Sequence, residues 1–134
     1  VLSCLASQVY TIERFPCLSL KAQEVLRKLG YTNVEMRIAD GTLGYPQKAP
    51  LDAIVVTAGA PKVPYSLLEQ LAEGGRLIIP LGNRYKQMLT RVVRKEEKFI
   101  HREIVDCIFV PLIGMEGWSD IQDNERRKGY DPED

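Results

Sequence analysis

The chain has 134 residues, of which 45% are hydrophobic and 27% charged, a composition typical of one soluble globular domain with its own core. Eighteen basic and eighteen acidic residues cancel, which argues against a nucleic-acid partner and against binding to an anionic membrane surface. No apolar run approaches the roughly 20 residues that span a bilayer, and the start lacks the features of a signal peptide. We therefore expect a cytoplasmic protein with no membrane partner.

Residues suited to metal or histidine chemistry are scarce. Cys4, Cys17 and Cys107 form no CxxC pair, which favours reduced, buried thiols over a disulfide framework or a zinc site. His101 is the only histidine and lies in a strand-like run. We expect a structural or surface role for it and predict no metal site.

The first part of the chain predicts a short helix and a strand. Residues 1–7 resemble the end of a helix, and the absence of an initiator Met suggests that the sequence starts inside a longer chain. Residues 8–12 form the first expected strand, which ends in the acid Glu13.

A helix and a second strand follow. Apolar residues recur at helical spacing over residues 16–29, and Gly30 supplies a left-handed stop. Residues 34–38 alternate apolar and charged side chains, which indicates a half-buried strand. This strand delivers Asp40 and Gly41 to its carboxyl end.

The middle of the chain continues the alternation of strand and helix. Residues 41–50 form a loop rich in Gly and Pro, and the unbroken apolar run in residues 52–57 predicts a central strand buried on both faces. A helix is expected at 65–72, ended by two glycines, and a strand at 76–81.

The last part of the chain departs from the parallel pattern. Residues 86–94 and 100–110 are rich in β-forming residues and are joined by a polar segment, which predicts an antiparallel hairpin. Residues 119–134 are polar and charged, so we expect a frayed helix or a disordered tail.

Acids at the ends of two successive strands indicate a nucleotide site. Glu13 can accept two hydrogen bonds from a ribose diol, and Asp40 would lie near an adenine. The Gly-rich turn of such sites lies about 20 residues before the acid. Only twelve residues precede Glu13, and none is glycine.

Seven segments in order resemble the protein-L-isoaspartate O-methyltransferase family, from Val9 to Trp118. They are residues 9–14 (Val-Tyr-Thr-Ile-Glu-Arg), 29–34 (Leu-Gly-Tyr-Thr-Asn-Val), 40–46 (Asp-Gly-Thr-Leu-Gly-Tyr-Pro), 49–58 (Ala-Pro-Leu-Asp-Ala-Ile-Val-Val-Thr-Ala), 63–71 (Val-Pro-Tyr-Ser-Leu-Leu-Glu-Gln-Leu), 74–82 (Gly-Gly-Arg-Leu-Ile-Ile-Pro-Leu-Gly) and 109–114 (Phe-Val-Pro-Leu-Ile-Gly). The ordered set is far more specific than any one segment. Two departures are Ala39, where the family often has Gly, and Gly59, where Ala is frequent.

The resemblance implies an α/β fold with a Rossmann-like methyltransferase sheet, mainly parallel with a C-terminal antiparallel hairpin. The family's strand order is 3-2-1-4-5-7-6, and the first strand and the glycine-rich loop are missing from this chain. We therefore expect a partial domain over residues 1–118 and a tail over 119–134. Val9–Ile12 and Ala53–Val56 should lack their central pairing partner.

The resemblance also implies a function: methyl transfer from S-adenosylmethionine to the carboxylate of L-isoaspartyl and D-aspartyl residues in damaged proteins. Isoaspartyl-containing proteins or peptides would be the partners. The cofactor-binding residues carried over are Glu13, Arg14, Asp40, Gly41, Thr57 and Ala58. The substrate-binding residues carried over are Gly59, Ala60, Pro61, Val110, Pro111 and Leu112. The family's Ser/Thr-containing segment would lie before Val1, so no catalytic residue is assigned.

Each site residue also has a simpler structural explanation. Glu13 could be an exposed strand-end carboxylate paired with a basic neighbour, and Asp40-Gly41 could be turn chemistry with Gly41 at positive φ. Residues 57–61 could be a tight connection, and residues 109–112 a strand that ends at a proline. Trp118 is expected to pack or lie on the surface.

Two alternative functions remain open from the sequence. One is a non-catalytic remnant or interaction module of the same family, which would self-associate through exposed strand edges if truncated and be a monomer if complete. The other is a methyltransferase with a small-molecule acceptor. For the chain alone we expect poor cofactor binding.

Overall fold

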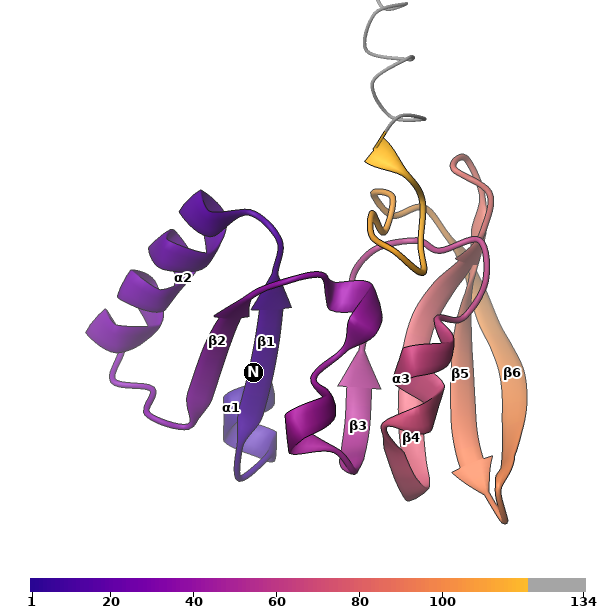
Figure 1. Cartoon of the computed structure of the whole chain (residues 1–134), viewed down its shortest axis with the longest axis horizontal. Helices are drawn as coiled ribbons and strands as arrows, with labels where there is room; N and C mark the ends of the chain where they lie inside the picture. The colour runs from indigo at the N-terminus through magenta and orange to yellow at the C-terminus, as the bar shows by residue number, and fades with distance from the viewer. Residues whose placement is uncertain (121–134) are drawn as a thin grey trace, which may run out of the picture. The chain divides into compact units, whose positions relative to one another are not determined.

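The computed structural model describes residues 1–120, which divide into two compact units, residues 1–41 and residues from 42 onward (Figure 1). Each unit has its own sheet. The expected polar tail lies outside the described residues from residue 121 on. The expectation of one partial domain over residues 1–118 stays a prediction.

The first unit is a parallel strand pair with a crossover helix. Its elements are α1 (Leu2–Leu5), β1 (Val9–Glu13), α2 (Pro16–Lys28) and β2 (Val34–Ile38). β1 and β2 pair in parallel, with Val9 opposite Val34 and Glu13 opposite Ile38. The predicted strand, helix and second strand are therefore confirmed.

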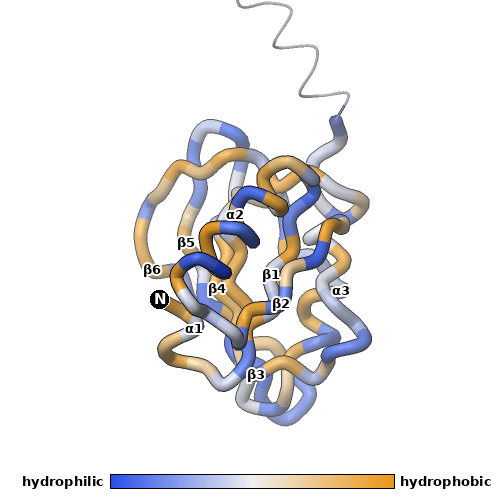
Figure 2. Tube along the Cα trace, turned by 90° about the vertical axis from the view of Figure 1, so that its left-hand side faces the viewer, coloured by the Kyte–Doolittle hydropathy of each residue, from blue (hydrophilic) through white to orange (hydrophobic). Residues whose placement is uncertain are grey.

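Local sequence explains where α2 begins and ends. Pro16 occupies its first turn, where a missing N–H costs nothing, and Gly30 follows it at φ 79°. Hydrophilic and hydrophobic residues alternate with the turns of α2 (Figure 2). The apolar stripe is nevertheless open, because Leu20 and Leu29 are 59% and 66% exposed. Two strands offer too little surface to cover it.

The second unit carries a mixed four-stranded sheet in the order β3-β4-β5-β6. The pair β3-β4 is parallel, and the pairs β4-β5 and β5-β6 are antiparallel, which confirms the predicted hairpin. Its elements are η2 (Pro46–Lys48), β3 (Leu51–Val55), α3 (Tyr65–Glu69), β4 (Leu71–Gly82), β5 (Gln87–Lys95) and β6 (Lys98–Cys107), and the short helix η1 (Gly41–Leu43) precedes them.

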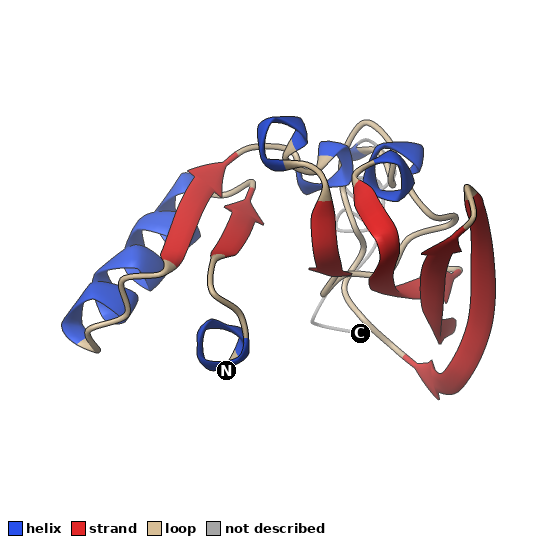
Figure 3. Cartoon of the chain, turned by 90° about the horizontal axis from the view of Figure 1, so that it is seen from below, coloured by secondary structure: helices blue, strands red, loops and turns tan. Residues whose placement is uncertain are grey.

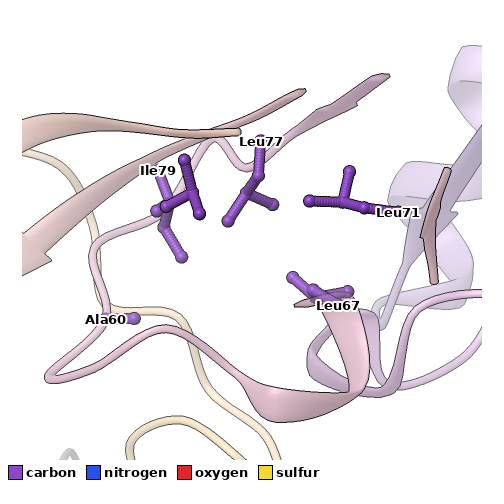
Figure 4. Close-up of a cluster of buried hydrophobic side chains, with 6 residues drawn as sticks. Ala60, Leu67, Leu71, Leu77 and Ile79 are labelled. Atoms are coloured by element: carbon purple, nitrogen blue, oxygen red, sulfur yellow. The ribbon is translucent and has the colours of Figure 1, made fainter. Parts of the chain in front are cut away.

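The core of the second unit lies between α3 and one face of this sheet (Figures 1 and 4). Leu67 of α3 packs against apolar side chains of β4 and β5 that are fully or almost fully buried. The six core residues are Ala60, Leu67, Leu71, Leu77, Ile79 and Val92. All of them belong to the second unit.

Three expectations about this sheet need correction. The strand after the Gly/Pro loop is not buried on both faces, because Ala53 and Val55 are exposed on the face away from α3. The helix ends at Glu69 instead of residue 72, because Leu71 already pairs with Leu51 in the sheet. β4 consequently starts five residues before the predicted strand.

The sheets have open edges. Within residues 1–120, β1 pairs only with β2, and β3 pairs only with β4. Each of these parallel strands therefore leaves one edge without a strand partner, as expected for Val9–Ile12 and Ala53–Val56. Exposed strand edges are sites at which further chains can pair.

Two further findings concern membrane-spanning helices and the cysteines. Among the described residues no helix has the length and apolarity required to cross a membrane. Cys4, Cys17 and Cys107 are free thiols, but the expectation that they are buried is wrong. Cys4 and Cys17 are exposed because the described part of the first unit has no buried apolar core against which they could pack.

A matched pair of substitutions tests where the core lies. Ile79→Val removes a methylene from a fully buried side chain, so we expect a loss of about 0.5–1.5 kcal/mol in the free energy of unfolding. Ile100→Val makes the same change on a side chain that is 52% exposed, and we expect a much smaller loss. Urea denaturation measures both. Equal losses would contradict a core restricted to the α3 side.

Candidate functional site

The parallel register brings the two predicted carboxylates to one edge of the first unit's sheet. Glu13 is the last residue of β1 and lies opposite Ile38, the last residue of β2. The Ala39 N–H donates to the Glu13 carbonyl oxygen at 3.2 Å, which extends the pairing by one residue. Asp40 follows directly. Adjacent carboxyl ends of parallel strands are where ligands bind in open α/β sheets.

Glu13 has a defined local contact. Its Oε1 accepts a hydrogen bond from the Phe15 N–H at 2.9 Å, at the start of α2. The Arg14 guanidinium lies 5.1 Å from the centre of the Phe15 ring. The Glu13 carboxylate is therefore oriented by the helix start instead of by a basic side chain, and its two oxygens have capacity for further hydrogen bonds.

Gly41 does not fit the explanation by turn chemistry. Its φ lies outside the left-handed region, and an added Cβ would meet no atom within 4 Å. The turn needs glycine at Gly44 instead, where φ is 63° and a Cβ would overlap the buried side chain of Gln70. Space beside Gly41 is thus open. Asp40 and Gly41 are both half-buried.

In the second unit, the structure brings together two predicted substrate segments that are about 50 residues apart in sequence. The Gly59 N–H donates to the Val110 carbonyl at 2.7 Å, and the Leu112 N–H donates to the Gly59 carbonyl at 2.8 Å. Gly59 and Pro111 form a parallel bridge. On the other side, Ala60 bridges to Leu81, so β4 supports the whole arrangement.

The residues of these segments differ in what they can offer a ligand. Ala60 is fully buried in the core, its N–H donates to Pro80 and its carbonyl accepts from Gly82, so it positions the segment. Ala58, Pro111 and Leu112 are half-buried. Thr57, Pro61 and Val110 are exposed, Val110 by 70%.

Gln87 is a residue that sequence reasoning missed. It is 3% exposed, its Oε1 accepts from the Phe109 N–H at 2.7 Å, and its Nε2 donates to the Asn83 carbonyl. A Cβ added at Gly59 would lie 2.9 Å from the Gln87 side chain. The amide of Gln87 therefore holds residue 109 beside Gly59.

Trp118 and Glu116 complete this corner. The Trp118 Nε1–H donates to the Gly59 carbonyl at 3.1 Å, so Trp118 is more than a packing residue. The Glu116 carboxylate accepts from both the N–H and the hydroxyl of Ser66 at the start of α3, and its own N–H donates to the Thr42 hydroxyl at 3.1 Å. These contacts join parts of the chain too distant for local sequence patterns to reveal.

Two other features of the described residues bear on ligand binding. A surface hollow of about 480 Å³ lies along α2 and β2, and neither Glu13 nor Asp40 lines it. In residues 1–120 no group of three or more His, Cys, Asp or Glu side chains is arranged to hold a metal ion.

Comparison with known proteins identifies the family. A family model described as protein-L-isoaspartate(D-aspartate) O-methyltransferase matches residues 3–117. The chain belongs to this methyltransferase family. The predicted resemblance is thereby confirmed.

Curated relatives and solved structures point to the same methyltransferase family. The protein-L-isoaspartate O-methyltransferases of Syntrophotalea carbinolica and Geobacter metallireducens are each 51% identical to this chain, over 92% and 88% of it. The chain spans 57% and 55% of their lengths. A solved protein-L-isoaspartate O-methyltransferase, 28% identical, matches 90% of this chain and 38% of its own at a TM-score of 0.75.

A Plasmodium falciparum structure assigned to the same enzyme class was solved in complex with S-adenosyl-L-homocysteine. It is 28% identical and has a TM-score of 0.69, over 79% of this chain and 52% of its own. The expected Rossmann-like methyltransferase fold is confirmed by these structures.

Gln87→Leu tests the role of the buried amide. The change keeps side-chain volume but leaves the Phe109 N–H and the Asn83 carbonyl without partners. We therefore expect the free energy of unfolding to fall by about 1–3 kcal/mol. Amide hydrogen exchange at Phe109 should speed up by a corresponding factor. Gln23→Leu, an exposed position on α2, is the control and should change neither measurement. Unchanged exchange at Phe109 would disprove the role.

Proposed function

We propose that the protein to which this chain belongs transfers a methyl group from S-adenosylmethionine to the carboxylate of L-isoaspartyl or D-aspartyl residues, which begins the repair of damaged proteins. Two findings support the proposal: the family match over residues 3–117 and the complex of the Plasmodium relative with S-adenosyl-L-homocysteine. The observation that carries it is the parallel register that sets Glu13 and Asp40 at adjoining strand ends.

The first unit would hold the nucleoside end of the cofactor. Glu13 would accept hydrogen bonds from the ribose hydroxyls, since the Phe15 N–H occupies one of its carboxylate oxygens and fixes the direction of the side chain. Asp40 and Gly41 would flank the adenine, and a Cβ added at Gly41 would meet no atom within 4 Å, so a ligand can approach the backbone there. The residues present thus fit a nucleoside.

Three further residues are assigned to the cofactor. Arg14 follows Glu13 and stacks on Phe15, which restricts its side chain near the ribose-binding acid. Thr57 and Ala58 follow the carboxyl end of β3, and exposure of Thr57 leaves its hydroxyl accessible. Small residues at such a strand end allow close approach of a ligand.

The second unit would hold the peptide. We assign substrate binding to residues 59–61 and 110–112, which are hydrogen-bonded into one rigid pair of segments. Pro61 and Val110 would contact the peptide with their exposed side chains. Gly59 and Ala60 would act through backbone position, because their N–H and carbonyl groups are already bonded within the protein.

The chemistry needs few polar groups. Bound S-adenosylmethionine supplies a methyl group activated by a sulfonium. The acceptor carboxylate, with an ordinary pKa near 4, is already ionised at neutral pH, so the protein needs no general base. The protein's contribution is orientation, which can be worth about 7–11 kcal/mol of the barrier.

Compartment and assembly belong to the same proposal. We place the protein in the cytoplasm, which the three free thiols support. The open edges of β1 and β3 favour self-association of this chain by itself. Sedimentation at two protein concentrations would detect it.

Glu13→Gln tests the ribose contact. Removing the charge from this acceptor should weaken binding of S-adenosyl-L-homocysteine by about tenfold or more, since hydrogen bonds to charged groups are worth about 1.5–3 kcal/mol. Saturation-transfer NMR detects the weak binding expected of this chain. Glu24→Gln makes the same change on an exposed acid of α2 and should leave the ligand signals unchanged. Equal signals from both variants would contradict the assignment.

Gly41→Ala separates fold from ligand binding. Because the added Cβ meets no atom and φ is unstrained, we expect the free energy of unfolding to change by less than about 0.5 kcal/mol. The methyl group would occupy space proposed for the adenine, so the NMR signals of the base protons should weaken. Unchanged signals would place the base elsewhere.

The activity itself is tested with two peptides that differ only in one linkage. Labelled S-adenosylmethionine should transfer its methyl group to an isoaspartyl peptide and not to the otherwise identical peptide with a normal aspartyl linkage. Label on small carboxylic acids in preference to the peptide would favour a small-molecule methyltransferase. Cofactor binding without any transfer would favour the non-catalytic remnant for this chain.

A further inference from the structure

A small closed loop follows directly on the segment assigned to peptide binding. It comprises residues 112–118 and is termed the 112–118 loop below. The Trp118 N–H donates to the Leu112 carbonyl at 2.8 Å, so the two ends of the loop meet. Within it, the Gly117 N–H donates to the Gly114 carbonyl at 3.1 Å. Because the loop is closed on Leu112, a displacement of the loop would also displace the end of the peptide-binding segment.

Gly117 shows how closely this loop packs. A Cβ added there would overlap the Leu112 carbonyl oxygen and would lie 3.2 Å from Cγ2 of Thr42. Position 117 therefore requires glycine for the close approach of two backbone segments. Thr42 is fully buried, so the loop packs against a side chain that solvent does not reach.

Glu116 connects the 112–118 loop to two other parts of the second unit. Its carboxylate accepts from the Ser66 N–H at 3.0 Å and from the Ser66 hydroxyl. Its own N–H donates to the Thr42 hydroxyl at 3.1 Å. Ser66 is the second residue of α3, a short helix on one side of the sheet formed by β3 to β6 (Figure 3). Since hydrogen bonds to a carboxylate are stronger than those between neutral groups, Glu116 is a firm anchor for the loop.

The hydrophobic core does not supply this anchor. Its six buried side chains come from residues before the loop, and Val92 is the last of them in sequence. Leu112 packs against this core but is only half-buried. Residues 110–112 are bonded to Gly59 through two backbone hydrogen bonds. The polar contacts of Glu116 are therefore a second, separate restraint on where the segment lies.

We propose that Glu116 is a positioning residue for the peptide site. Its hydrogen bonds to Ser66 and Thr42 hold the 112–118 loop, and with it residues 110–112, where they accept an isoaspartyl peptide. The inference rests on the proposed function, because it assigns a role within the same peptide site. Glu116 acts through the loop backbone and needs no contact with the peptide. Its loss should therefore weaken peptide binding and spare both cofactor binding and the chemical step.

Amide hydrogen exchange in the full chain tests the anchoring by itself. In Glu116→Ala, exchange at Gly117 and Trp118 should speed up by about tenfold or more, because hydrogen bonds to a charged group are lost. Glu69→Gln changes an exposed carboxylate on the last residue of α3 and should alter neither rate. This measurement requires neither cofactor nor peptide.

Steady-state kinetics of the protein to which the chain belongs test the role in peptide binding. Glu116→Ala should raise the KM for an isoaspartyl peptide by about three- to thirtyfold and leave kcat and the KM for S-adenosylmethionine within about twofold. Ser66→Ala removes only the hydroxyl donor and should raise the peptide KM by a smaller factor. The double variant should match Glu116→Ala, because the two side chains act through one contact.

Two control variants separate positioning from loss of stability. Val92→Ala removes methyl groups from a fully buried side chain of β5, so it should lower stability and leave the peptide KM unchanged. Glu69→Gln should leave both stability and the peptide KM unchanged. Circular dichroism at the assay temperature confirms that each variant is folded.

Three results would overturn the proposal. They are unchanged exchange at Gly117 and Trp118 in Glu116→Ala, an unchanged peptide KM in both Glu116→Ala and Ser66→Ala, and an equal rise of the peptide KM in Val92→Ala. A wild-type protein that methylates no isoaspartyl peptide would instead overturn the proposed function, and this inference with it, even where the exchange rates show that Glu116 holds the loop.

Discussion

One-sided packing is the constraint on which the second unit depends. Its six core side chains lie between α3 and a single face of the sheet, and Leu77 and Val92 meet there across two strands. That layer fixes β4, and β4 in turn supports the bridge from Leu81 to Ala60. The segments proposed to hold the peptide are therefore anchored by hydrophobic burial. The close-packed core fixes their positions.

Local patterns were sufficient for the elements whose signals are local. Helical spacing with Pro16 and Gly30 predicted α2, and strict alternation predicted β2. The hairpin was predicted from two β-rich runs, and its two-residue turn has both Glu96 and Glu97 at positive φ. The apolar run of β3 was misinterpreted, because burial on both faces requires a second covering layer that the described residues do not supply.

The residues of the candidate site also fall into those that local sequence predicts and those that it does not. The acids at strand ends were predictable, because parallel strands place their carboxyl ends together whatever the intervening sequence. Gln87 and Glu116 were not, since their partners lie 22 and 50 residues away in the chain. Buried polar side chains form hydrogen bonds with backbone groups that are distant in sequence. Such partners produce no periodic pattern in the sequence. The family's frequent Ala at residue 59 is replaced by Gly where the Gln87 amide comes close.

The contact between Trp118 and Gly59 gives the protein a built-in optical probe. Trp118 is the only tryptophan of the chain, its indole N–H is bonded to the Gly59 carbonyl, and the Arg84 guanidinium lies 4.9 Å from the centre of its ring. Its emission therefore responds to water and charge at one corner of one unit. Loosening of that corner, by heat, ligand or substitution, will be visible as a shift in ultraviolet fluorescence without any added dye.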